Sequence, residues 1–179
     1  MAVVDRVGIF IDGGYLDKVL SNGFGGAKVD LGTFAATLAG STEILRTHYY
    51  HCLPYQGNPP APEERARFAS AQRYLSALGR LPRFEIRLGR LAKISGQFTQ
   101  KRVDTLLAID MVRLASKQQI SRAILVSGDS DFAPPVLAAK AEGVLVTLFY
   151  APPVHNELLE ACDERKLIDQ ALVTACRRQ

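Results

Sequence analysis

Four aspartates carry the most specific chemical signal in this sequence. Asp12 comes directly after an apolar run, and Asp129 and Asp131 come shortly after a second run. Asp104 stands at the start of a long helical pattern. Carboxylates held together raise each other's pKa unless a cation neutralises them. Mg²⁺ and Mn²⁺ prefer oxygen ligands, so the pattern indicates a Mg²⁺ or Mn²⁺ site that activates water and stabilises the charge of a phosphodiester.

Apolar runs and helical periodicities predict the elements that position these aspartates. Residues 7–11 and 123–126 are short runs typical of strands buried on both faces, and further strands are expected at 44–53, 84–88 and 144–150. Helical spacing predicts helices at 15–20, 31–38, 63–78, 103–116 and 131–142. Strands that alternate with helices predict an α/β fold, with a parallel sheet and helices on both of its faces.

The expected sheet brings the four aspartates to one edge. Ligands of open parallel sheets bind beyond the carboxyl ends of the strands, which is where all four side chains are expected. The glycines Gly13, Gly14 and Gly128 lie between or beside them and allow backbone to approach a ligand closely. This coincidence favours the metal-site interpretation over separate roles for each residue.

Each aspartate also has a purely structural alternative. Asp12 alone fits a turn or helix cap, and Asp131 fits the N-cap of the helix that follows it. A negative charge such as Asp104 is favourable near a helix N-terminus. Asp110 lies six residues after Asp104, about 240° round the helix, so we expect it beneath the site, capping or paired with Lys101 or Arg113.

Length and composition bound the class of protein. The chain has 179 residues, of which 47% are hydrophobic, so we expect a single domain over 1–179, with 151–179 as a C-terminal helical extension and a short strand possible at 166–168. No apolar run reaches the roughly 18 residues of a membrane span, and no signal peptide is recognisable, so we expect no membrane partner and a cytoplasmic location. Three scattered cysteines argue against a disulfide framework or a zinc finger.

Positive charge is concentrated in one segment. The formal net charge of the chain is +4, whereas residues 83–102 hold six basic residues and one acidic residue, a net charge of +5. Arg90, Lys93, Lys101 and Arg102 precede Asp104, and we expect them to hold phosphates of a polyanionic partner, although each alone fits a solvated surface. Tyr15 is a candidate for stacking on unpaired bases.

Three sequence blocks resemble the NYN domain, a branch of the PIN-like nuclease superfamily. They are FIDGGYL at 10–16, KRVDTLLAIDMV at 101–112 and VSGDSDFAPPV at 126–136, in the order found in the family. The resemblance covers roughly residues 6–150. It implies a PIN-like three-layer α/β/α sandwich with a central, mostly parallel sheet, five or six strands in this chain.

The resemblance also implies a function and a set of site residues. It suggests a divalent-metal ribonuclease centre at Asp12, Asp104, Asp129 and Asp131, with RNA, single-stranded or structured, as the substrate. Ser127 would support a ligand or phosphate. The family commonly has Asn three residues after the first Asp, and this chain has Tyr15 there, so the positioning of water or substrate by that Asn is lost.

Two other functions stay open. A non-catalytic RNA-binding or assembly module of the same fold would explain Tyr15. A haloacid-dehalogenase-type phosphatase also has an Asp after its first strand, but it needs a second Asp two residues later, where this chain has Gly14. His48 and His51 lie in a strand pattern and are expected on a sheet face. The segment 149–153 or the C-terminal helix could cover a sheet edge or pair with a second copy in a homo-oligomer.

Overall fold

The protein is described by a computed structural model that covers residues 5–94 and 97–178. Side chains are described for all of these residues except 92–101. The strands are β1 (Arg6–Asp12), β2 (Glu43–Cys52), β3 (Phe84–Ile94), β4 (Gln97–Lys101), β5 (Arg122–Val126), β6 (Leu145–Tyr150) and β7 (Glu164–Leu167). The helices are α1 (Gly13–Gly23), α2 (Leu31–Ala39), α3 (Pro62–Leu78), α4 (Val103–Ser116), α5 (Ala133–Ala141), α6 (Asn156–Ala161) and α7 (Gln170–Ala175), with a short 3₁₀ helix at Ser130–Phe132. This alternation of strands and helices confirms the predicted α/β class.

One mixed sheet forms the middle layer. Its strand order is β4-β3-β2-β1-β5-β6-β7, and every neighbouring pair is parallel except β3 and β4. Six parallel strands agree with the prediction. The seventh strand of the described chain is β4, which arises because β3 continues to Ile94 and the basic segment folds back on it as a hairpin.

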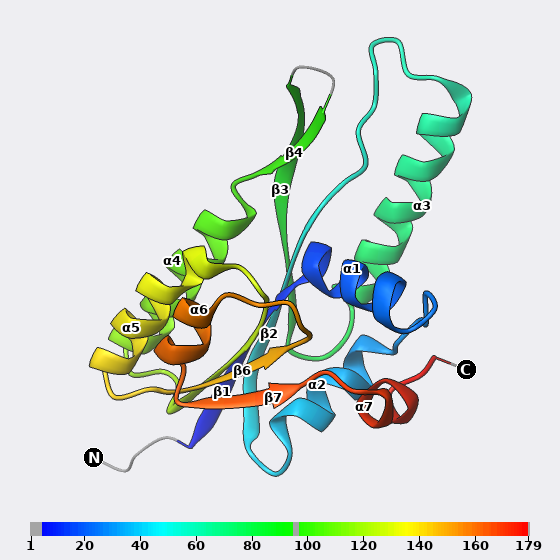
Figure 1. Cartoon of the computed structure of the whole chain (residues 1–179). Coiled ribbons are helices and arrows are strands. Elements are labelled where there is room, and N and C mark those ends of the chain that lie inside the picture. The colour runs from blue at the N-terminus through cyan, green and yellow to red at the C-terminus, as the bar shows by residue number, and fades with distance from the viewer. Residues whose placement is uncertain (1–4, 95–96, 179) are drawn as a thin grey trace.

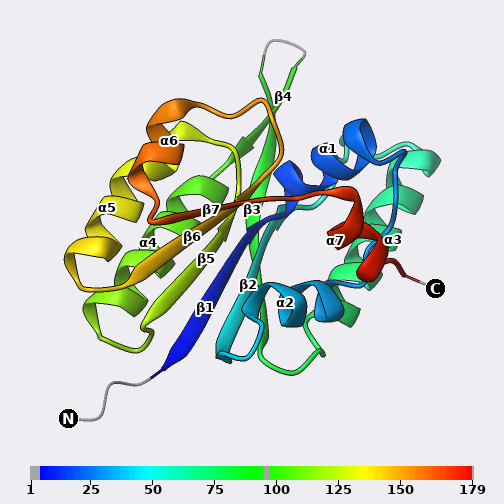
Figure 2. The ribbon, with the colours of Figure 1, turned by 60° about the horizontal axis from the view of Figure 1, so that its bottom comes forward.

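Helices cover both faces of the sheet (Figure 2). Phe10 packs with α4, α5 and α6 in one core cluster, whereas its neighbours Ile9 and Ile11 pack with α1, α2 and α7 in another. Successive side chains of a strand point to opposite faces. The continuous apolar run of β1 is therefore explained by burial on both sides of the sheet.

Aspartates fix the starts of several helices. The side chains of Asp12, Asp30 and Asp169 accept backbone N–H groups at the first turns of α1, α2 and α7. This capping satisfies donors that have no partner within the helix. Helix α1 consequently begins at Gly13, directly after β1, rather than at the predicted Tyr15, and the turn between strand and helix is as short as it can be.

Two elements extend beyond the carboxyl edge of the parallel strands. Figure 1 shows the β3–β4 hairpin and the N-terminal half of α3 rising past this edge, on the side where α1 and α4 begin. Only Leu75 and Leu78 of α3 are buried, both near its C-terminal end. The hairpin and α3 thus project from the edge of the sheet at which β1 and β5 end.

The C-terminal segment returns to the sheet. Strand β7 pairs with β6 and lies close to the expected short strand, and α6 and α7 flank it. Leu158 on α6 and Val173 on α7 are buried in opposite core clusters. The segment 151–178 is therefore packed on both faces of the same sheet as the rest of the chain.

Candidate active site

Asp12, Asp129 and Asp131 lie just past the ends of two adjacent strands. Asp12 is the last residue of β1, and β5, which pairs with β1, ends at Val126 opposite Ile11. The next residue, Ser127, is buried, and its hydroxyl is 3.5 Å from Asp12 Oδ2 and accepts the backbone N–H of Asp129 at 3.3 Å. Ser127 therefore joins the two acidic turns.

Two of these carboxylates also cap helices. Asp12 Oδ1 accepts the backbone N–H of Tyr15 at 3.0 Å, and Asp129 Oδ1 accepts that of Asp131 at 3.0 Å. The structural alternative for Asp12 is thus fulfilled with one oxygen, and the second oxygen stays near Ser127. The cap of the 3₁₀ helix is Asp129, not Asp131, which lies exposed within it.

Asp104 completes the group from the other side. It is the second residue of α4. Loss of hydration raises its pKa above the usual value, and the negative charges of Asp12, Asp129 and Asp131 raise it further. Burial likewise raises the pKa of Asp12, with Asp129 adding to the effect and the Tyr15 N–H opposing it. Asp104 is therefore close enough to the other three carboxylates for their charges to act on it.

This group has the chemistry of a site for a hard divalent cation but is not a closed cage. Among the residues that the structure describes, none of the four carboxylates forms a salt bridge, and no three acidic, His or Cys side chains meet closely enough to hold an ion as they stand. Mg²⁺ and Mn²⁺ accept carboxylates together with several waters. Carboxylate oxygens without a salt bridge are the type of ligand that such an ion takes.

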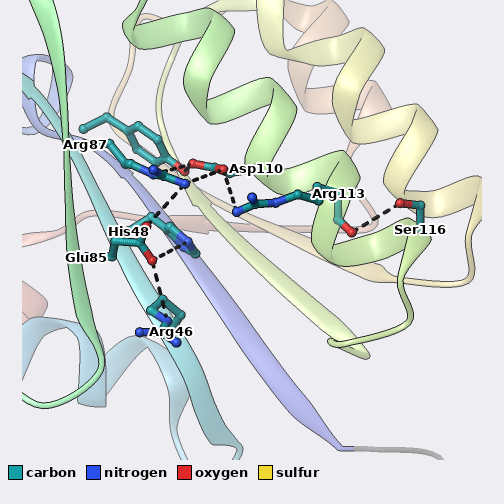
Figure 3. Close-up of polar contacts among 8 residues, drawn as sticks. Arg46, His48, Glu85, Arg87, Asp110, Arg113 and Ser116 are labelled. Atoms are coloured by element: carbon teal, nitrogen blue, oxygen red, sulfur yellow. Dashed lines mark hydrogen bonds and ion pairs between the residues drawn. The ribbon is translucent and has the colours of Figure 1, made fainter.

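Asp110 lies on α4 where the helix packs against β2 and β3. It is buried, receives two hydrogen bonds from the guanidinium of Arg87 at 2.9 and 3.0 Å and one from the hydroxyl of Tyr50 at 3.0 Å, and pairs with Arg113 at 3.1 Å (Figure 3). The predicted pairing with Arg113 is present. Arg87, which the sequence analysis did not single out, is its main partner and joins α4 to β3.

Tyr15 is held by the protein on its ring and on its hydroxyl. The hydroxyl donates to the carbonyl of Ala151 at 3.1 Å and accepts its N–H at 2.9 Å. A Cβ added to Gly128 would lie 2.5 Å from the ring. Gly128 therefore makes room for the ring of Tyr15, and Gly13 likewise makes room for the rings of Tyr49 and His51.

The basic candidates lie on and beside the hairpin. Arg90 is exposed on β3, and its backbone pairs with that of Lys101 on β4. Arg102 is exposed and precedes α4 with a left-handed backbone, φ 76°. The side chains of Lys93 and Lys101 lie outside the described residues. Arg102 is therefore two residues before Asp104. Arg90 lies on the strand that pairs with the residues leading into α4.

The sequence analysis did not predict the pairing of His51 with Asp17, which lies beside the carboxylates. His51 Nε2 is 2.9 Å from Asp17 Oδ2, and its Nδ1 is 2.8 Å from both the backbone N and O of Cys52. Burial opposes the charged ring, but the Asp17 hydrogen bond and the nearby charges raise the pKa of His51. Both ring nitrogens are engaged, so His51 orients the end of β2. The sequence held no signal for this pair, because Asp17 and His51 are 34 residues apart.

Comparison with known proteins agrees with the fold. The NYN domain matches residues 6–169. The crystal structure of a protein of unknown function, VPA0982, from Vibrio parahaemolyticus RIMD 2210633 has a TM-score of 0.68, 20% identity, and coverage of 95% of this chain and 96% of that one. The uncharacterized protein y4oD of Sinorhizobium fredii is 42% identical over 67 residues, which is 37% of this chain and 31% of that protein.

These similarities define first a class and then a family. The layered α/β architecture is shared with the Vibrio protein, which defines the fold class. Because the NYN domain match spans nearly the whole chain, the protein belongs to the NYN domain family of PIN-like nucleases. The chain spans about a third of the length of y4oD. Within the described residues no helix is long and apolar enough to cross a membrane.

Proposed function

We propose that this protein is a divalent-metal-dependent ribonuclease whose reaction takes place at Asp12, Asp104, Asp129 and Asp131. The observation that carries the proposal is the position of the carboxylates: Asp12, Asp129 and Asp131 follow the adjacent strands β1 and β5, and Asp104 begins α4. Carboxylates that oppose one another without a salt-bridge partner are characteristic of functional sites. Membership of a nuclease family supports the same conclusion.

The side chains would share the work as follows. Asp12, Asp104 and Asp129 would hold Mg²⁺ or Mn²⁺, which supplies an activated water and neutralises phosphate charge when bound. Asp131, which is exposed beside them, would orient the attacking water or hold a second ion. Ser127 fixes the Asp12 and Asp129 turns relative to each other through its hydroxyl.

The substrate-binding part of the proposal concerns the hairpin. Arg90 and Arg102, together with Lys93 and Lys101, would hold phosphates on either side of the cleaved bond. The hairpin extends past the edge where the acidic residues lie (Figure 1). Tyr15, whose hydroxyl is bound to Ala151, would offer at most one ring face to a base.

Binding of RNA without cleavage is the second candidate. The specific observation in its favour concerns Tyr15. This residue stands where the NYN family commonly has Asn, and its ring fills the space over Gly128. The two functions differ in their response to metal. A non-catalytic module binds RNA equally in EDTA and in Mn²⁺ and leaves the strand intact.

We also propose that residues 5–178 act as one domain, since β7 extends the central sheet.

A substrate panel tests the proposal. Purified protein is incubated with 5′-labelled single-stranded RNA, hairpin RNA and single-stranded DNA, each with Mg²⁺, Mn²⁺ or EDTA. We expect RNA fragments with Mg²⁺ or Mn²⁺ and none with EDTA. RNA that binds but stays whole in every divalent ion would favour the second candidate, and cleavage in EDTA would contradict both.

A further inference from the structure

A pocket separate from the acidic group lies on the face of the sheet that α1, α2 and α7 cover. It has a volume of about 520 Å³ and is enclosed by α1, α3, the segment 26–31 and Arg178. Leu16 and Leu20 of α1 and Val29 give it apolar walls. Hydrogen bonds from Asp30 N to Cys176 O and from Arg178 N to Lys28 O hold the two strands of chain that form one side.

Tyr49 of β2 brings a phenol to the wall of the pocket. The residue is 2% exposed and lines the pocket. Its ring is packed against Gly13, where an added Cβ would lie 2.6 Å from the ring and 2.7 Å from the hydroxyl. A tyrosine hydroxyl can both donate and accept a hydrogen bond. This wall therefore carries one polar group, beside the first turn of α1.

Two cations line the pocket without a salt-bridge partner in the described part of the chain. Lys28 and Arg178 line it, and neither forms a salt bridge among residues 5–94 and 97–178. Asp17, the acidic residue in the lining, is already paired with His51 at 2.9 Å. Asp30, whose charge reaches Arg178, is engaged in capping α2 through Thr33 N at 2.7 Å. The mouth of the pocket therefore suits an anionic group.

An aromatic ring stands beside these cations. Tyr74 on α3 lines the pocket and is 40% exposed, so one part of its ring is available for stacking. A flat heterocycle can stack on tyrosine and still use hydrogen bonds at its edge. Apolar walls, a stacking ring, one deep hydroxyl and two cations at the mouth are the features of a site for an aromatic ring that carries a phosphate.

We propose that this pocket binds a nucleotide, either free or as one unit of an RNA strand. The base would lie between Leu20 and Tyr74 with its polar edge on the Tyr49 hydroxyl, and the phosphate would be held by Lys28 and Arg178. A volume of about 520 Å³ is within the range of roughly 300–1,000 Å³ that small-molecule sites occupy.

For RNA, the inference rests on the proposed function and extends it. Tyr49 lies under Gly13, the first residue of α1, and Asp12 caps the same turn. The first turn of α1 therefore contacts Tyr49, which lines the pocket, and is capped by Asp12 of the acidic group. A strand that passes over this turn would place one nucleotide in the pocket while another reaches the acidic edge.

Binding in EDTA tests the inference without any cleavage. Calorimetric titrations of the whole chain use AMP, UMP, adenosine and inorganic phosphate. We expect saturable binding of a nucleoside monophosphate that is tighter than binding of adenosine or phosphate alone. Tyr49→Phe removes one neutral hydrogen bond and should weaken that binding about fivefold. Arg178→Ala and Lys28→Ala should weaken it by a similar factor, and most of that loss should disappear with adenosine.

Matched controls and a competition experiment complete the design. Tyr150→Phe and Lys117→Ala alter the same residue types outside the pocket and should bind as the parent does. Displacement of AMP by a ten-nucleotide single-stranded RNA assigns the site to an RNA unit, and AMP binding that the RNA does not displace assigns it to a free nucleotide. Should Tyr49→Phe fail to fold, as judged by thermal unfolding, the exposed Arg178 and Lys28 variants provide the test.

Some results would overturn the inference independently of the nuclease proposal. No saturable binding of either mononucleotide in EDTA would do so, as would affinities unchanged in the Arg178, Lys28 and Tyr49 variants. If RNA is cleaved with Mn²⁺ while these titrations fail, the pocket proposal alone is lost. If nucleotides bind as expected and no RNA is cleaved, the pocket stands and the nuclease proposal fails.

Discussion

At the scale of single residues, Asp12 and Asp104 are ionised at a cost. Burial and the charge of neighbouring carboxylates raise the pKa of both. An aspartate whose pKa is raised on folding lowers stability at neutral pH, and this cost disappears below its usual pKa of 3.8. Such a cost is typical where residues are retained for function rather than for stability.

Asp104→Asn should therefore make the metal-free protein more stable at pH 7. Because Asp104 lies at the surface, we expect a gain of only about 0.3–0.5 kcal/mol in the free energy of unfolding. Mn²⁺ should raise the melting temperature of the parent more than that of the variant, since a ligand stabilises the state that binds it. Thermal unfolding with EDTA and with Mn²⁺ measures both effects, and Asp5→Asn is the control. A variant less stable than the parent in EDTA would contradict this interpretation.

His48 predicts a pH dependence of stability. It is 2% exposed, stacks on Phe10 with ring centroids 5.3 Å apart, and its Nδ1 has no partner among the described residues. Burial lowers its pKa, and the charges of Asp110 and Glu85 only partly oppose this. The unfolded chain therefore takes up a proton near pH 6.5, whereas the folded protein does so only at lower pH, and stability is lost as the pH falls through this window.

His48→Phe keeps the stacked ring and removes the titrating group. The parent should lose up to about 1 kcal/mol of His48-dependent stability between pH 7 and pH 5. Between the same pH values, the free energy of unfolding of the variant should fall by up to about 1 kcal/mol less than that of the parent. Urea unfolding of both proteins at the two pH values gives the difference. Equal losses in parent and variant would show that His48 titrates in the same way folded and unfolded.

At the scale of elements, Asp110 fastens α4 to the sheet. It accepts hydrogen bonds from Tyr50 of β2 and Arg87 of β3 and pairs with Arg113 on its own helix. Asp110→Ala would leave the buried Tyr50 hydroxyl without its partner, while the partly exposed arginines would regain water. We expect a loss of about 2–3 kcal/mol.

Urea unfolding checks this value, and Arg113→Ala serves as the comparison because Arg113 is exposed. The Arg113 variant should lose less than about 1 kcal/mol. A loss from Asp110→Ala within 0.5 kcal/mol of zero, the range typical of surface changes, would show that α4 is held by its apolar face alone.

The elements themselves were largely predictable, whereas contacts between distant elements were not. Apolar runs and helical spacing identify strands and helices because burial acts on local patterns. The Asp110–Arg113 pair was within reach, since residues three apart share a helix face. The Arg87–Asp110 and Asp17–His51 pairs depend on strand register and on helix placement. No local pattern contains that information.

The glycines beside the site show a similar limit. The sequence identifies Gly13 and Gly128 as positions of close approach but does not say what approaches. The structure places aromatic rings there, from Tyr49 and His51 at Gly13 and from Tyr15 at Gly128. The left-handed backbone of Arg102 lies where the β3–β4 hairpin leads into α4.

At the scale of the whole molecule, the distribution of charge matters more than its total. The net charge of +4 is exceeded by the +5 of residues 83–102, so the rest of the chain is nearly neutral. This segment forms β3, β4 and the residues that lead into α4. RNA binding driven by phosphate contacts should therefore depend on this one region and should weaken as salt rises.

Arg90→Ala and Arg102→Ala should each reduce the salt dependence of RNA binding. Loss of one phosphate contact lowers the slope of log K against log salt by about 0.7 for a single strand. Fluorescence anisotropy with labelled RNA in EDTA, from low to moderate salt, gives the slope. Arg122→Ala, at the opposite end of the sheet and paired with Asp5 at 3.9 Å, is the control. A slope unchanged in both hairpin variants would exclude this region from the RNA interface.

The most direct measurement is the single-turnover cleavage rate of Asp129→Asn on single-stranded RNA in Mn²⁺, beside the parent and Asp5→Asn. Asn can still accept the N–H of Asp131, so the 3₁₀ helix keeps its cap while one charge is removed from the acidic group. We predict a rate at least about 100-fold lower than that of the parent, with Asp5→Asn unchanged. Cleavage by Asp129→Asn as fast as by the parent would contradict a metal-dependent reaction at these carboxylates.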